Sequence, residues 1–338
     1  MTVAATTVNH AVSRDGTEIG WFSGGEGPAL VLVHGLLGDH TRWEVLLPYL
    51  REHFTVHAVD RCGRGASGDH AEYDGVRECE DVAAVVEAVA NEAGAAVDVY
   101  GSSGGGSFAL RAATLTDSIR RLVLFEPPGR QVVGLLPDRL LDELDALLDA
   151  GEREALLGAS YRHLVGLSDA DIEHLRGQPE WPNRVAAAHT VPRELRVAPE
   201  AFLTPDEVTG IGLPTLVMIG GTSPPQFRAA GEALAAALPN GDLALLEGQG
   251  HGAEMLAPGV VAEAVLDFLL GEGLPNGTRW ARTRRRWGCP SRSSTNGWWS
   301  MPSGTTQRGS STSASRQGCF TPSPAMDPAS VRTNSQGR

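Results

Sequence analysis

Short apolar runs alternate with amphipathic stretches along most of this 338-residue chain. The runs have the length of β-strands and carry Val and Leu at successive positions, which predicts a parallel sheet buried on both faces. The stretches between them have helical periodicity, so we expect helices on each side of that sheet. An early hairpin around Glu18–Phe22 is expected to add antiparallel strands at one edge. The expected strands are Ala29–Val33, Phe54–Val59, Ala96–Tyr100, Arg121–Phe125, Thr215–Ile219 and Leu243–Leu246, and the expected helices are Thr41–Glu52, Asp74–Glu92, Ser103–Leu115, Gln226–Leu238 and Val260–Leu269.

The alternation stops between residues 129 and 200, where only helical patterns occur. Leucines repeat at helical spacing over Leu140–Leu148, and we expect the helices to be broken at Pro179, Pro182 and Pro192. Ligands of open α/β sheets bind at the carboxyl ends of the strands. A helical insertion of this size between two strands therefore predicts a lid over that end of the sheet.

Residues 275–338 differ in composition from the rest of the chain. They contain no Leu or Ile and only one Val, and Gly, Pro, Ser and Thr fill 33 of the 64 positions. A segment so poor in aliphatic residues cannot bury enough surface to offset the entropy lost on folding. We interpret it as GC-rich DNA read out of frame, with a basic, disordered interaction arm as the alternative. The predicted division is an α/β core of residues 1–128 and 201–274, a lid of residues 129–200, and this tail.

Charge and cysteine content exclude several classes of protein. The formal net charge is −13, so the chain lacks the basic footprint that nucleic acid and anionic membrane surfaces require, and neither is an expected partner. Four cysteines without a C-x-x-C pair argue against a disulfide framework or a structural zinc cluster. No secretory signal is visible in Met1–His10, and no apolar run approaches the length of a membrane span. We expect a cytoplasmic protein that acts on a small molecule, without a metal or organic cofactor.

The segment Gly101–Gly105, with the sequence GSSGG, follows a predicted strand and precedes a predicted helix. It matches the G-x-S-x-G pattern in the strand-to-helix context that presents a nucleophilic serine. The sharp turn strains its central residue, so the residues two positions before and after it must be small. With Ser103 at the centre both neighbours are glycines, whereas Ser102 would place Tyr100 there. Ser103 is the predicted nucleophile; the alternatives are a glycine-rich turn with incidental serines and a weak phosphate loop.

The turn at Gly101–Gly105, called the elbow below, is one of the features by which residues 17–270 resemble the α/β-hydrolase superfamily. The resemblance implies the α/β-hydrolase fold. Two further motifs agree with it. His34–Gly38 (HGLLG) is similar to the family's HG loop, and Asp60–Ser67 (DRCGRGAS) is similar to its D-x-x-G-x-G-x-S turn. By position, the resemblance implies an oxyanion hole formed by the backbone N–H groups of Leu36 and Gly104.

A serine nucleophile also needs a histidine base and a carboxylate that orients the histidine. His251 follows the last predicted strand, where the family keeps its histidine, and is the predicted base. The family's usual place for the carboxylate, after Thr215–Ile219, holds no Asp or Glu. Glu126 ends the neighbouring strand Arg121–Phe125, about 4.8 Å away in a parallel sheet, and is the predicted acid. Glu247 is the alternative acid.

A glutamate at this place is typical of a minority of the superfamily, and the chain is similar to lactonases of the zearalenone-hydrolysing type. The loop Gly221–Phe227 and the segment Pro179–Trp181 resemble theirs. The apolar side chains of the predicted lid favour an apolar or aromatic substrate, and Trp181 is the predicted substrate contact.

The sequence therefore predicts a serine hydrolase that cleaves an ester or a lactone through Ser103, His251 and Glu126 and an acyl-enzyme. Hydrolysis of a C–C or amide bond and cofactor-free perhydrolysis use the same residues and stay open. A ligand-binding, receptor-like protein of the same fold is the alternative outside catalysis.

Removing residues 275–338 is expected to raise the solubility of the protein, because the tail lies beyond the last predicted helix of the core. The soluble yield of a chain that ends at Leu274 is the measurement. An equal or lower yield than that of the full chain would contradict this interpretation of the tail.

Overall fold

The computed structural model describes residues 7–70, 72–130 and 136–271. The predicted tail, residues 275–338, lies outside the described residues.

One eight-stranded sheet has the strand order β1-β2-β4-β3-β5-β6-β7-β8. The strands from β3 to β8 are parallel, and β1 and β2 are antiparallel at one edge, as the predicted hairpin required. The strands are β1 (Thr7–Val12), β2 (Glu18–Gly24), β3 (Ala29–Val33), β4 (Thr55–Val59), β5 (Val97–Ser102), β6 (Ile119–Phe125), β7 (Thr215–Gly220) and β8 (Gly241–Leu246).

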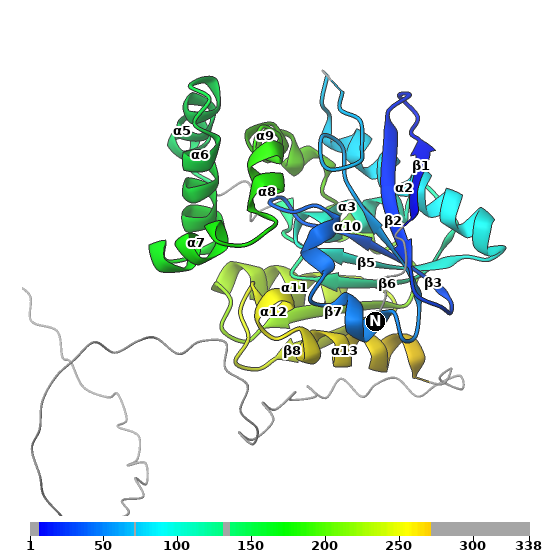
Figure 1. Cartoon of the computed structure of the whole chain (residues 1–338). Helices are drawn as coiled ribbons and strands as arrows, with labels where there is room; N and C mark the ends of the chain where they lie inside the picture. Colours follow the sequence, from blue (N-terminus) through cyan, green and yellow to red (C-terminus); the bar gives the residue numbers. More distant parts are fainter. Residues whose placement is uncertain (1–6, 71, 131–135, 272–338) are drawn as a thin grey trace, which may run out of the picture. The chain divides into compact units, whose positions relative to one another are not determined.

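Successive side chains of each central strand enter two different apolar clusters. In β3, Val31 and Val33 pack on one face of the sheet, and Leu30 and Leu32 pack on the other. The first face is covered by α2 (Gly75–Ala93), α3 (Gly104–Ala112) and α11 (Pro225–Ala237). The second is covered by α1 (Leu47–Leu50) and α13 (Pro258–Leu270). Figure 1 shows α2 and α13 on opposite sides of the strands. This burial on both faces explains why the strands read as continuous apolar runs.

The prediction of one continuous helix over Thr41–Glu52 is wrong. The structure has a short 3-10 helix, η1 (His40–Trp43), followed by the single turn α1. Pro48 lies in the first turn of α1, and its ring disfavours helical backbone immediately before it. The proline divides the segment, although the apolar side chains on both sides of the break still pack into one cluster.

Every element that the structure describes between residues 136 and 201 is a helix. Pro182 and Pro192 lie in the first turns of α8 and α9, where a proline is tolerated, so they do not break those helices. We call α5–α9 the helical segment; that it acts as a lid stays a prediction. Its elements are α5 (Asp138–Asp149), α6 (Arg153–Ser160), the π-helix η2 (Tyr161–Val165), α7 (Asp169–Arg176), α8 (Trp181–Ala187) and α9 (Thr190–Ala201), and the remaining helices of the core are α10 (Pro205–Val208) and α12 (Ala253–Leu256).

Helix α3 packs unusually close to β3 and β5 because glycines stand at the contact. A Cβ on Gly105 would lie 2.2 Å from the backbone oxygen of His34, and one on Gly101 would lie 2.5 Å from the Cα of Gly106. Side chains at these positions are sterically excluded, so the glycines of the GSSGG segment are a packing requirement as well as a turn signal.

None of the helices in the described part of the chain combines the length and the apolar character needed to cross a membrane.

Gly105→Ala is expected to lower the free energy of unfolding by about 3 kcal/mol or more, because backbone atoms rather than a flexible side chain occupy the space of the new methyl group. Urea unfolding measures it. The control is Gly94→Ala at the end of α2, which has a positive φ but open space around it and should cost about 1 kcal/mol. Equal costs for the two variants would contradict the packing argument.

Candidate active site

Four consecutive strands of the parallel sheet bring the predicted catalytic residues to one edge. Ser103 follows β5, Glu126 follows β6, and His251 lies in the loop after β8. The strands β5, β6, β7 and β8 are direct neighbours and run in the same direction, so their carboxyl ends meet. The backbone N–H of Ser103 also donates to the oxygen of Phe125, the residue before Glu126.

Two non-glycine residues in the described part of the chain have positive φ angles, and they are Ser103 (φ 51°) and Glu126 (φ 43°). Such backbone is costly for residues with a Cβ and persists where the surrounding structure imposes it. Ser103 is the N-cap of α3 and lies in the strained turn that the sequence predicts for an elbow. The strain at Glu126 was not predicted, because a single E-P-P segment carries no such signal.

The carboxylate of Glu126 is fully buried and holds the histidine loop. Its Oε2 lies 2.5 Å from Nδ1 of His251, and its Oε1 accepts a 2.7 Å hydrogen bond from the backbone N–H of Gly220. The glutamate therefore occupies the place of a carboxylate that fixes a histidine tautomer, with Nδ1–H donating to Oε2. The His251 ring packs against the rings of Phe125 and Phe227, with centroid distances of 6.2 and 4.6 Å, which gives it apolar walls.

Glu247, the alternative acid, is half-buried in the loop after β8. The carboxylate that contacts Nδ1 of His251 is that of Glu126, so the role of Glu247 stays a prediction. Arg130, four positions after Glu126, donates to the backbone oxygen of Phe202.

The HG loop lies directly against the elbow. A Cβ on Gly35 would be 3.1 Å from the Cβ of Ser103, so a side chain at this position would press against the serine. His34 is buried, and desolvation together with the charges of Arg61 and Arg64 lowers its pKa well below the ordinary value. The neutral ring donates from Nδ1 to the Gly35 oxygen at 2.8 Å and accepts at Nε2 from the Arg61 backbone N–H at 3.2 Å.

The two predicted oxyanion donors, Leu36 and Gly104, directly follow the two residues in contact here, Gly35 and Ser103. Gly104 is the first residue of α3, where backbone N–H groups lack partners within the helix and carry the positive end of the helix dipole. Leu36 is half-buried and packs with its side chain against the helical segment. The structure thus brings both residues next to Ser103, one through α3 and one through the HG loop.

A buried glutamate behind the elbow is a feature that the sequence did not reveal. Glu254, in α12, is 1% exposed and accepts from Ser102 Oγ at 2.6 Å, from the Tyr100 hydroxyl at 2.5 Å and from Arg42 Nη2 at 2.5 Å. Burial and the charge of Glu254 raise the pKa of Tyr100 well above its ordinary value, so the tyrosine is a donor. One carboxylate therefore joins the elbow, the histidine loop and the segment after the HG loop.

Trp181 lies in the apolar cluster of the helical segment and is 5% exposed. Its indole stacks on Tyr161 with ring centroids 6.3 Å apart, and its contact with a substrate stays a prediction.

Among the described residues, Asp39, His40 and Asp60 form a group whose ligand atoms lie within 4.8 Å of one another, as a metal site would need. These atoms already have protein partners. Asp60 accepts from the His40 and Ala66 backbone N–H groups at 2.7 and 2.8 Å and bonds the His40 ring, and Asp39 caps η1 through the Thr41 N–H. The three side chains are therefore used to hold the start of η1 and the loop after β4 in place.

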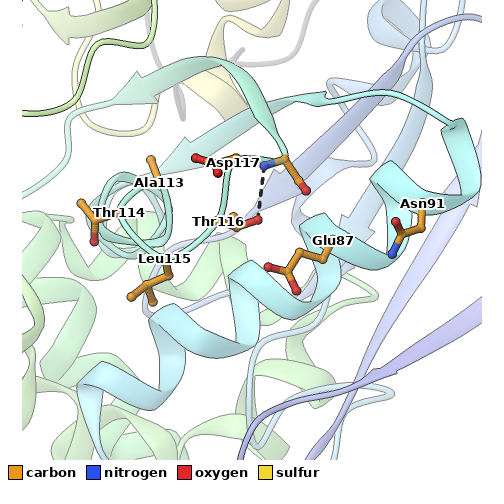
Figure 2. Close-up of a pocket in the computed structure, with 8 residues that line it drawn as sticks. Glu87, Asn91, Ala113, Thr114, Leu115, Thr116 and Asp117 are labelled. Carbon is orange, nitrogen blue, oxygen red and sulfur yellow. Dashed lines mark hydrogen bonds between the residues drawn. The ribbon is translucent and has the colours of Figure 1, made fainter.

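A polar hollow of about 550 Å³ lies at the other end of the sheet. Figure 2 shows Glu87 and Asn91 of α2 facing the turn that connects α3 to β6. That turn holds Thr116, whose hydroxyl accepts from the Ser118 N–H at 3.2 Å. Because β6 begins at this turn and ends at Phe125, just before Glu126, the hollow is remote from the predicted catalytic residues.

Comparison with known proteins gives one family. A family model described as "Alpha/beta hydrolase family" matches residues 30–264. The chain is 35% identical to a solved alpha/beta hydrolase of Sphaerobacter thermophilus, with a TM-score of 0.66 over 77% of this chain and 99% of that one. It is 36% identical over 146 residues to N-formylmaleamate deformylase of Pseudomonas putida and 38% identical over 103 residues to pyrrolizixenacetamide deacetylase of Xenorhabdus hominickii. These matches cover 40% and 30% of this chain, and only 50% and 38% of those two relatives.

Glu254→Gln is expected to lower the free energy of unfolding by about 3 kcal/mol, because it removes a buried charge that accepts from Ser102, Tyr100 and Arg42 and leaves the 13% exposed Arg42 side chain without this charged partner. Urea unfolding followed by tryptophan fluorescence is the measurement. Glu263→Gln, at an exposed position of α13, is the control and should change it by less than about 0.5 kcal/mol. A cost below about 1 kcal/mol for Glu254→Gln would contradict the inferred network.

Proposed function

The chain belongs to the alpha/beta hydrolase family, and on that premise we propose that it is a serine hydrolase with a Ser103–His251–Glu126 triad. The observation that carries the proposal is the 2.5 Å contact between Glu126 Oε2 and His251 Nδ1, made by a fully buried carboxylate at the end of the strand next to the elbow. The positive φ angles of Ser103 and Glu126 support it, because strained backbone is typical of functional positions.

In the proposed reaction, Ser103 Oγ attacks the substrate carbonyl while His251 takes the serine proton at Nε2. Glu126 keeps the other ring nitrogen protonated and stabilises the imidazolium that forms. The N–H groups of Leu36 and Gly104 bind the oxyanion. The imidazolium then protonates the leaving group, and His251 activates a water molecule that releases the acyl group from Ser103.

The substrate class that we propose is an ester or a lactone with a small apolar or aromatic acyl group. The aromatic walls of His251, formed by Phe125 and Phe227, support an apolar acyl group. The apolar cluster of the helical segment, with Leu36 and Leu37 packed against it, supports the same class. The proposal needs no metal or organic cofactor, and cytoplasmic location stays a prediction from the sequence.

Hydrolysis of an amide is the second candidate. Both curated relatives are named for the removal of a small acyl group, an acetyl group in one and an N-formyl group in the other. The same triad would serve that reaction, with His251 as the acid that protonates a leaving nitrogen. A panel of p-nitrophenyl esters from acetyl to decanoyl, one aromatic lactone and one N-formyl amide separates the candidates by their kcat/KM values.

Ser103→Ala is expected to lower kcat by about 10⁵-fold and Glu126→Gln by about 10³–10⁴-fold on the best substrate of that panel. The glutamine keeps the shape of the side chain but removes the charge that stabilises the imidazolium. Steady-state kinetics on variants with unchanged circular dichroism spectra measures both effects.

Glu247→Gln is the matched control and is expected to keep kcat within about twofold. If Glu247→Gln lost activity and Glu126→Gln kept it, Glu247 would be the acid. If the folded wild type hydrolysed nothing in the panel and its serine resisted a fluorophosphonate, the proposed hydrolase would be wrong and a ligand-binding role would replace it.

A further inference from the structure

Two arginines of the loop after β4 are buried beside the HG loop. Arg61 and Arg64 are 1% and 2% exposed, and they pair with Glu78 of α2 and Glu194 of α9. Arg61 also lies over the ring of Phe108, 4.9 Å from its centroid. Four buried charges are costly even when they are paired, and apolar side chains of similar volume often stabilise a fold as well. The position of this cluster therefore points to a role beyond packing.

Arg61 holds the peptide group that contains a predicted oxyanion donor. Its Nη2 donates to the Gly35 oxygen at 3.3 Å and to Glu194 Oε2 at 2.8 Å, and the same Gly35 oxygen accepts from His34 Nδ1. The Gly35 carbonyl and the Leu36 N–H belong to one planar trans peptide, so they point in opposite directions. Binding the carbonyl from one side consequently directs the N–H to the other side.

Glu194 is linked to Leu36 through Arg64 and lies close to Gly104. Its Oε2 also accepts from Arg64 Nη2 at 2.5 Å, and Arg64 donates to the Leu36 oxygen at 3.3 Å. A Cβ on Gly104 would lie 3.3 Å from the other carboxylate oxygen, Oε1. Burial alone would raise the pKa of Glu194, but the charges of Arg61 and Arg64 outweigh it and lower the pKa below the usual value. The carboxylate is therefore charged. The positive charges of the two arginines offset the repulsion that it would exert on an oxyanion nearby.

We propose that Arg61 and Glu194 are a positioning pair for the oxyanion hole. Arg61 fixes the direction of the Leu36 N–H through the Gly35 carbonyl, and Glu194 fixes the guanidinium from α9. The helical segment thereby contributes to the geometry of the catalytic edge, although Glu194 itself donates nothing to the substrate. The inference rests on the proposed function, because Leu36 is an oxyanion donor only in a hydrolase of this kind.

The double variant Arg61→Met/Glu194→Met tests the pair. It removes one charge of each sign and leaves Arg64 and Glu78 as a balanced pair. We expect kcat per titrated active site to fall about tenfold and KM to stay within twofold. The loss is smaller than the 10²–10³-fold effect of removing an oxyanion donor, because the Leu36 N–H is misdirected and not removed. The inhibition constant of phenylboronate, which forms a tetrahedral adduct on the serine, should rise by about the same factor. Should the double variant not fold, Arg61→Lys keeps the charge, but its ammonium ends about one bond short of Nη2. The 3.3 Å bond to the Gly35 oxygen would then be lost, and this variant should show the same changes.

The matched control is Asp69→Asn/Arg193→Gln. It removes an ion pair between the same loop and the same helix, 2.5 Å long and partly exposed, that does not contact the HG loop. This control should keep kcat and the phenylboronate constant within twofold. The inference is overturned if the Arg61 variants keep the wild-type values, or if the control loses as much as they do. Absence of turnover and of fluorophosphonate labelling in the wild type would instead overturn the proposed function.

Discussion

The buried carboxylate of Glu126 joins the ends of three neighbouring strands. It stands at the end of β6, accepts a hydrogen bond from Gly220 at the end of β7 and binds His251 in the loop after β8. An unpaired carboxylate would be too costly at this depth, so its two partners are a condition of the fold as well as of the site. Ser103, the predicted nucleophile, follows the next strand, β5, at the same edge of the sheet.

Two further buried glutamates attach the surrounding loops to the same edge. Glu254 links Ser102 of the elbow to Arg42 after the HG loop, and Glu194 links the arginines of the loop after β4 to the helical segment. Each carboxylate is almost fully enclosed and meets at least one guanidinium. Buried charges of this kind are directional, and they hold the loops at defined places where apolar contacts alone would let them shift.

Local patterns were sufficient to predict most of the elements. The strand Ala29–Val33 and the start of α3 after Ser103 follow from apolar runs and glycine spacing, which are properties of neighbouring residues. The predicted single helix over Thr41–Glu52 is wrong, because apolar periodicity continues across Pro48 while the proline interrupts the helical backbone. The resemblance to the α/β-hydrolase superfamily, based on the elbow and the HG loop, is confirmed by the family match.

The sequence by itself determined the alternation of strands and helices, the elbow at Ser103 and the absence of a carboxylate after Thr215–Ile219, since these are patterns between near neighbours. Only the tertiary structure decided which charged groups meet. Ser102 and Glu254 are 152 positions apart, and Arg61 and Glu194 are 133 positions apart. No local periodicity connects such residues; they are brought together because parallel strands place distant loops at one edge and because a buried charge must find its partner there.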